Sequence, residues 1–204
     1  MKRNIINVIG LFFLLVVLPA MSWVYLSKGL SYQKAKRAEL REYGKIPPFP
    51  YMLLNGDSIG ALELKGKLLM VFDAVDGVDA STEVVFKELE KIHRQFDERK
   101  DVIFLLQAAQ KDSMLLEQLL KRYKLADQGQ VYAVAGRPGA GFRIGTKDGS
   151  TKTGLVAIAD SSGVIRQYYD FLDGNRVRRS VEHIAMLMPF RDRDEAVLKR
   201  EKEK

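Results

Sequence analysis

The stretch LLMVFDAVDGVDAS, residues Leu68–Ser81, decides the fold of this protein. It opens with the apolar run Leu68–Phe72, which has the length and composition of a strand buried on both faces. The loop that follows contains three aspartates, Asp73, Asp76 and Asp79. A helix is predicted next, with Asp79 or Ser81 as its N-cap. Such a loop is a common place for a functional site in α/β proteins, because the helix dipole favours an anion there. The sequence therefore predicts a site here, although the loop contains no obvious catalytic group.

Strand and helix patterns alternate through the rest of the chain. Further strands are predicted at Val102–Leu106, Val131–Ala135, Leu155–Ala159 and Val164–Tyr169. Three helices are predicted from apolar residues at helical spacing: Val85, Leu89, Ile92 and Phe96; Leu116, Leu119, Leu120 and Tyr123; and Val177, Val181, Ile184 and Met188. Asp112 or Ser113 is expected to cap the second of them, and Gly136–Gly154 is expected to be a long loop. This order predicts an α/β fold, a three-layer sandwich around a central mixed sheet.

The N-terminal segment Ile5–Leu26 is apolar and long enough to cross a membrane as a helix. We expect residues 1–27 to form a signal-anchor, single-pass transmembrane helix. A cleaved signal peptide is the alternative, because Ala20-Met21-Ser22 resembles a cleavage site. Basic residues flank both ends of the segment, and their count alone would place the domain in the cytoplasm.

Composition sets the remaining boundaries. Residues 28–46 are expected to form a polar stalk and linker that is helical over Ser31–Tyr43 and is ended by prolines. Residues 47–190 are expected to form the folded domain, in which Asn55-Gly56 predicts a hairpin turn. Residues 191–204 are expected to be a charged, mobile tail, because they lack an apolar stripe.

The composition also excludes several kinds of function. The sequence has no cysteine, which rules out disulfides and thiol chemistry. The net charge of +7 is spread along the chain rather than gathered in one stripe, so no nucleic-acid partner is expected. His93 and His183 lie on separate helices without ligand-spaced neighbours, and we expect them at the surface or its rim. No metal, cofactor or catalytic constellation is therefore predicted.

Several of these segments resemble the Sco/SenC family of thioredoxin-fold proteins, which serve copper delivery to cytochrome oxidase. The central strand and its loop resemble the family's active segment, in which Phe and two further residues precede Cys-x-x-x-Cys. The stretch LVAIADSSGVIRQYYDFLD, residues Leu155–Asp173, resembles the family's later hairpin. GKIPPFPYMLLNGD, residues Gly44–Asp57, resembles the segment that leads into the family's domain. The resemblance covers Gly44–Pro189.

The resemblance implies a thioredoxin-like domain whose reactive positions are altered. Counted from Phe72, the two cysteine positions fall at Val75 and Asp79, and the copper-ligating histidine falls close to Lys152. The chain is thus identified as a cysteine-free, degenerate member of the family. We predict neither thiol–disulfide activity nor Cu(I) binding of the Sco type, because soft copper requires sulfur ligands.

The function that the resemblance implies is a non-catalytic, membrane-anchored accessory factor in respiratory (cytochrome c) oxidase assembly. Its domain would lie on the periplasmic or extracytoplasmic side and bind a membrane-protein client, such as an oxidase subunit or another assembly factor. The expected binding loops are Asp73–Ala80 and Gly145–Thr153, with Asp73, Asp76, Asp79, Lys147 and Lys152 as the charged contacts. Two alternatives stay open: a divalent-cation or small-ligand site at the three aspartates, and a membrane-tethered scaffold unrelated to respiration.

Overall fold

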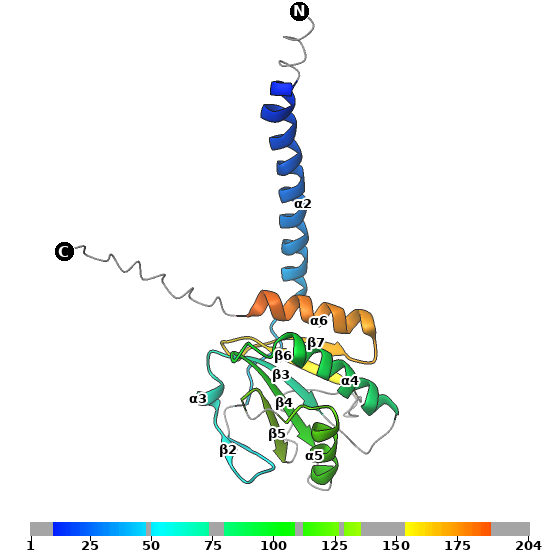
Figure 1. The fold of residues 1–204 in the computed structure, drawn as a ribbon. Helices are drawn as coiled ribbons and strands as arrows, with labels where there is room; N and C mark the ends of the chain where they lie inside the picture. The colour runs from blue at the N-terminus through cyan, green and yellow to red at the C-terminus, as the bar shows by residue number, and fades with distance from the viewer. Residues whose placement is uncertain are drawn as a thin grey trace, which may run out of the picture. The chain divides into compact units, whose positions relative to one another are not determined.

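The computed structural model describes residues 10–47, 50–73, 80–108, 112–126, 129–135 and 154–188. The chain divides into two compact units, residues 1–40 and residues 41–204. Figure 1 shows the elements of both units along the chain. The expected charged tail, residues 191–204, lies outside the described part.

The first unit is a single helix that runs from Gly10 to Glu39. Its length and composition would allow it to cross a membrane. A signal sequence near the N-terminus can also have such a length and composition. A π-helical turn, η1 (Phe13–Val17), precedes α2 (Leu18–Glu39). Pro19 explains this turn, because proline has no N–H to donate and its ring displaces the carbonyl of residue 15, within η1.

The second unit is built on a five-stranded mixed sheet with the order β5-β4-β3-β6-β7. The strands are β3 (Leu68–Asp73), β4 (Val102–Ala108), β5 (Val131–Ala135), β6 (Leu155–Ala159) and β7 (Ile165–Asp170). The first three are parallel, whereas β6 and β7 run antiparallel to β3 and to each other. The prediction that the strand at Leu68–Phe72 is central is confirmed: it has neighbours on both sides and is fully buried.

Three helices cover one face of this sheet: α4 (Ala80–Gln95), α5 (Ser113–Arg122) and α6 (Gly174–Leu187). The helices α4 and α5 share a face because the strands that they connect, β3, β4 and β5, lie side by side in sequence order. Right-handed crossovers then place both connecting helices on the same side of the sheet. The stripe predicted for α4 is buried, as are Leu116, Leu119 and Leu120 of α5. These helices pack on alternate strand residues such as Leu68, Met70 and Phe72.

The opposite face is covered by the chain that precedes β3. A hairpin of β1 (Tyr51–Met52) and β2 (Ser58–Ile59) and the short helix α3 (Ala61–Leu64) form this layer. The predicted Asn55-Gly56 turn lies between the two strands. Gly56 has φ +89°, a backbone conformation that residues with a side chain rarely adopt. Tyr51 anchors the layer: its hydroxyl donates to the Pro47 carbonyl oxygen at 2.9 Å, and burial raises the pKa of this phenol to about 12.

The segment after α2 differs from the predicted helical stalk. The helix ends at Glu39 rather than at Tyr43, because the next residues are extended and bond to β7. The Arg41 N–H donates to the Arg166 carbonyl at 3.0 Å, and the Tyr43 N–H donates to the Ile165 carbonyl at 2.9 Å. Residues 41–44, assigned to the linker from the sequence, therefore add to the outer edge of the sheet.

Asp160 fixes the conformation of the turn between β6 and β7 through its hydrogen bonds. Its carboxylate accepts hydrogen bonds from the N–H and hydroxyl of Ser162, from the Val164 N–H, and from the Arg166 guanidinium at 2.6 Å. Burial alone would raise the pKa of Asp160, but these hydrogen bonds and the charge of Arg166 together hold it below its usual value. Arg166 also pairs with Glu42 at 2.9 Å, which ties the segment after α2 to the turn.

The two histidines differ in how they meet the sequence expectation. His93 is half-buried at the rim of α4, with its ring edge-on to Phe104. The prediction for His183 is wrong, since only 1% of its surface is exposed. This position shares the inner face of α6 with Ser180 and Ile184, and its Nδ1 shares a hydrogen bond with the Tyr169 hydroxyl. A buried polar partner on β7 thus makes burial of the ring possible.

Candidate functional site at the carboxyl edge of the sheet

The predicted site lies where β3 ends. Asp73 is the last residue of the strand, and α4 begins at Ala80. On the other side of β3, Gly154 leads directly into β6, and Phe72 pairs with Val156 in the antiparallel ladder. The fold therefore brings the end of β3, Asp73, and the residue before β6, Gly154, to the same edge of the sheet.

The structure describes only part of the predicted residue set. Asp73 is placed at the end of β3, in register with Gln107 of β4. The other predicted positions lie outside the described residues: Val75, Asp76, Asp79, Lys147 and Lys152. The contact between the two loops, the burial of Val75 and a cap at Asp79 thus stay predictions. Ser81 lies inside the first turn of α4 and does not precede the helix.

The described floor of this edge is apolar. The Phe72 ring meets the Phe171 ring edge-on, with centroids 5.3 Å apart. Gly154 has φ +86°, and a Cβ atom there would lie 3.1 Å from Leu172 and 3.3 Å from Val85. This close approach requires glycine and packs the start of β6 against α4 and against the turn that precedes α6. The floor holds the two loop ends rigidly and supplies no charged group.

The described carboxylates at this edge have structural tasks. Asp173 is the N-cap of α6 and accepts a hydrogen bond from the Asn175 N–H at 2.9 Å. Asp170 accepts from the Leu172 N–H at 3.0 Å, which shapes the turn before the helix. No group of three or more His, Asp or Glu side chains arranged to hold a metal occurs within the described residues. The described part of the edge therefore offers helix caps and turn contacts, and no ligand set.

Gln107 is a feature of this edge that the sequence reasoning missed. The strand was predicted to end at Leu106, but β4 continues to Ala108, and Gln107 is only 4% exposed. Its side-chain Nε2 is buried and finds no acceptor within the described part of the chain. A buried donor without a partner costs about 1–3 kcal/mol, so its retention beside a predicted site is notable. A lone glutamine after five apolar residues was the available sequence signal.

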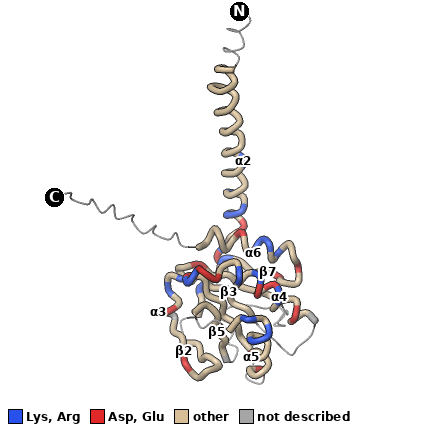
Figure 2. Tube along the Cα trace, in the orientation of Figure 1, with Lys and Arg blue, Asp and Glu red and all other residues tan. Residues whose placement is uncertain are grey.

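Charge is distributed evenly over the described part of the domain. Basic and acidic segments alternate along α4, α5 and the strand edges (Figure 2). Glu83 at the start of α4 pairs with Arg122 at 2.7 Å, and both side chains are largely exposed. Such exposed pairs contribute little stability, roughly 0–1 kcal/mol.

Comparison with known proteins finds similar folds but no similar sequence. No protein-family model matches the chain, and no curated protein is significantly similar to it in sequence. Solved structures do match the described topology. The fold is thioredoxin-like. A SCO1/SenC family lipoprotein from Bacillus anthracis has a TM-score of 0.54 at 15% identity, covering 71% of this chain and 95% of its own.

Two further solved structures give the same result. BsSco, described as a member of the Sco family of cytochrome c oxidase assembly proteins, has a TM-score of 0.55 at 11% identity, covering 72% of this chain and 96% of its own. The C-terminal domain of a thiol-disulfide oxidoreductase from Bacteroides thetaiotaomicron has a TM-score of 0.54 at 19% identity, covering 72% and 98%. Structural matches at identities this low establish the thioredoxin-like fold alone. The activity must be argued from this chain's own residues.

Proposed function

We propose that this protein is a membrane-anchored, non-catalytic, partner-binding factor that assists assembly of a respiratory cytochrome c oxidase. The observation that carries the proposal is a thioredoxin-like frame, shared with Sco structures, in a sequence without a single cysteine. Thiol–disulfide exchange requires a thiolate nucleophile, and Cu(I) prefers sulfur ligands. The chain keeps the frame and lacks the sulfur chemistry, which favours binding over catalysis.

The carboxyl edge is the surface proposed to bind the partner. The described residues Asp73 and Gly154 lie there, and the segments that adjoin them in the sequence contain Asp76, Asp79, Lys147 and Lys152. A mixed-charge surface of this kind fixes register and steers association more than it supplies affinity.

The helix at Gly10–Glu39 supports membrane attachment. We propose a single-pass anchor with the domain on the periplasmic or extracytoplasmic side. A helix that continues to Glu39 is a stiff stalk, since each residue adds about 1.5 Å along its axis. Only Leu40 separates the end of this helix from the residues bonded to β7, so the connection between anchor and domain is short.

A gene-deletion experiment in the source organism tests this function. Loss of the gene is expected to lower the amount of active cytochrome c oxidase in isolated membranes, measured by oxidation of reduced cytochrome c. Wild type should restore the activity, whereas the double variant Asp76→Lys/Asp79→Lys should not, because charge reversal misplaces the partner. Asp97→Lys, at an exposed position after α4, is the matched control and should restore activity fully.

The outcomes are separable by two further measurements. Immunoblots and melting curves of the variants distinguish lost binding from lost folding. Oxidase levels that do not depend on the gene would contradict the proposed function and favour a tethered scaffold outside respiration. A rise in melting temperature with Ca²⁺ or Mg²⁺ that disappears in the double variant would instead favour a cation site, because a bound ligand stabilises the folded state in proportion to RT ln(1 + [L]/Kd).

A further inference from the structure

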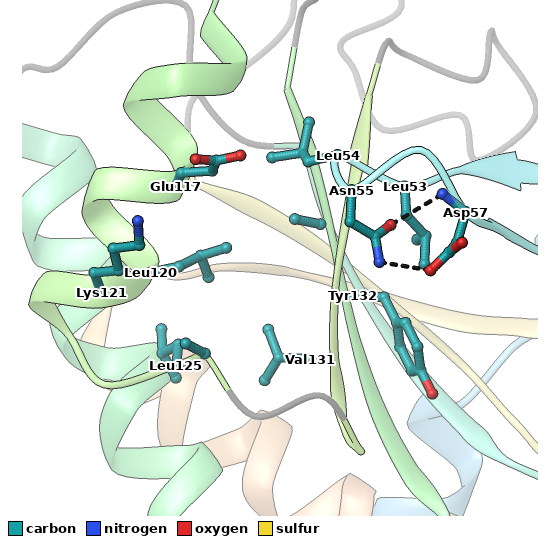
Figure 3. Close-up of a pocket in the computed structure, with 12 residues that line it drawn as sticks. Leu53, Leu54, Asn55, Asp57, Glu117, Leu120, Lys121, Leu125, Val131 and Tyr132 are labelled. Atoms are coloured by element: carbon teal, nitrogen blue, oxygen red, sulfur yellow. Dashed lines mark hydrogen bonds between the residues drawn. The ribbon is translucent and has the colours of Figure 1, made fainter.

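A groove lies along the outer edge of β5, at the end of the sheet away from β7. It has a volume of about 720 Å³ and lies between α5 and the β1–β2 hairpin (Figure 3). The side chains of Leu120, Leu125 and Val131 form an apolar floor, and each is less than a tenth exposed. Leu54 forms the opposite wall. The groove is thus a preformed apolar surface that opens to solvent.

Val131 of β5 directs backbone groups toward this groove that have no hydrogen-bond partner among the described residues. The Phe104 N–H of β4 donates to the Gln130 carbonyl at 2.8 Å, so Gln130 faces β4. Successive residues of a strand direct their N–H and C=O groups to opposite sides, so Val131 and Ala133 direct theirs outward. The hairpin already pairs with the outer side of β5 beyond Val131: Leu53 bridges Val134 in the antiparallel sense, and the Leu54 N–H donates to the Ala133 carbonyl at 3.0 Å. Among the described residues no group bonds to the outward N–H or C=O of Val131.

Acidic groups stand on both walls of the groove. Glu117 projects from α5 and Asp57 from the hairpin turn, and both are exposed. Asp57 is held by its turn, where its Oδ2 accepts a hydrogen bond from the Asn55 amide at 2.7 Å. Neither carboxylate is paired with a cation within the described residues. Lys121 is the one basic residue lining the described groove, so the walls carry a net negative charge.

From these observations we propose that the outer edge of β5 binds an extended peptide segment of a partner protein, in which apolar and basic residues alternate. The peptide adds as a strand beside Val131, which supplies one N–H donor and one C=O acceptor. Its apolar side chain lies on the floor between Leu120 and Leu125, and the next side chain points to the opposite face. A second hollow opens there, whose charged lining residues are Asp57, Glu63 and Lys67, so its lining keeps a net negative charge that favours a lysine or arginine.

The strand edge decides between this occupant and a compact small molecule. A small molecule could fill the apolar floor but would leave the paired donor and acceptor of Val131 without the spacing that a backbone provides. The residues that carry this proposal, Leu120, Leu125 and Val131, are distinct from the charged contacts of the proposed function. The proposal can therefore be tested without assuming a role in oxidase assembly.

The experiment uses the full chain in a zwitterionic detergent and two fluorescent hexapeptides, one alternating Val and Lys and the other alternating Val and Glu. We expect the Lys peptide to bind with a Kd below about 1 mM, measured by anisotropy, and the Glu peptide to bind at least about tenfold more weakly. Hydrogen exchange at the Val131 amide should slow when the Lys peptide is bound, because that N–H becomes the donor of a new strand pair.

Two variants and one control complete the test. Ala126→Trp adds a large ring to an exposed position that lines the groove, and should weaken binding of the Lys peptide about tenfold without unfolding the domain. Asp57→Asn/Glu117→Gln should remove the preference for Lys over Glu. The control Asp97→Lys should change neither. Failure of the Lys peptide to bind, equal binding by Ala126→Trp, or unchanged exchange at Val131 would each overturn the proposal.

Discussion

Two buried glutamines at opposite ends of the sheet show how differently the two ends are built. Gln130 lies at the amino edge, just before β5, and its Nε2 donates to the carbonyl oxygens of Phe96 and Arg99 at 2.8 and 2.5 Å. Gln107 lies at the carboxyl edge, and its Nε2 has no acceptor within the described residues. Both are nearly inaccessible to solvent, at 2% and 4% exposure. The Nε2 group thus donates twice at one end and has no acceptor among the described residues at the other, although the buried Gln130 Oε1 also has no described partner.

The rest of the amino edge agrees with this contrast. Asp160 accepts four hydrogen bonds there, and Arg99 pairs with Asp101. The described carboxyl edge instead has an apolar floor, a glycine in a left-handed conformation and an unfilled donor. Local departures from good hydrogen bonding concentrate at functional sites in natural proteins. The contrast teaches that the amino edge contributes stability, and that the carboxyl edge is the better place to look for binding.

The largest expected effect is on Asp160. Asp160→Ala leaves four donors without their acceptor, and we expect the free energy of unfolding to fall by about 3–4 kcal/mol at pH 7. Because the folded-state pKa of Asp160 is lowered, its contribution is complete above its unfolded pKa of about 3.9 and is lost as the pH falls through the lower folded-state value. Urea unfolding at pH 7 and pH 2 measures both effects. A difference from wild type that persists undiminished at pH 2 would contradict the assignment.

Gln130→Leu is the next largest. It removes two donors from buried carbonyls, each of which keeps one backbone hydrogen bond, so we expect a loss of about 2 kcal/mol in unfolding free energy. Denaturant titration by circular dichroism measures it, with Gln118→Leu at an exposed position of α5 as the control. A stability equal to that of wild type would remove the claim that the amino edge is built for stability.

Gly154→Ala tests the packing at the carboxyl edge. The added methyl group lies 3.1 Å from Leu172, and the residue must keep φ +86°, so we expect a loss of about 1–2 kcal/mol. Gly56→Ala is the control, because it has nearly the same positive φ, +89°, but no atom within 4 Å of the new Cβ. The two melting curves should therefore differ by the steric contribution alone. Equal losses would show that Leu172 and Val85 yield freely.

The smallest expected change in stability is at Gln107. Gln107→Leu replaces an unfilled buried donor by an apolar group of similar size, so stability should be unchanged or raised by up to about 1 kcal/mol. A loss of stability like that of Gln130→Leu would remove the contrast between the two edges.

Most of the architecture could be predicted because it depends on periodicity. The five strands of the sheet were placed to within two residues at each end, since apolar runs of this length are buried wherever they occur. The helices followed from stripes such as Val85, Leu89, Ile92 and Phe96. The end of the first helix was misplaced, because a polar segment such as Arg41–Tyr43 has no local signal that distinguishes a stalk from an edge strand. Its partner, β7, lies more than 120 residues away in the sequence.

The location of the candidate site could be predicted from the sequence, but its residues could be predicted only in part. The strand–loop–helix pattern at Leu68–Ser81 located the carboxyl edge, and the absence of cysteine excluded sulfur chemistry there. The burial of Gln107 and His183 could not be predicted, because both are polar residues whose burial depends on which neighbours pack around them. The Tyr169 hydroxyl meets His183 only after β7 and α6 fold together.

By itself, then, the sequence determined the element order, the central strand, the apolar N-terminal helix and the lack of any thiol, because each depends on local composition or spacing. Only the tertiary structure decided that the end of β3 and the start of β6 lie at one edge, that Val131 of β5 faces a groove with backbone groups that have no described partner, and that the Nε2 groups of two similar glutamines differ in their hydrogen bonding. These features depend on strand order and long-range pairing. A one-dimensional pattern does not specify them, because the same elements can be ordered in a sheet in several ways.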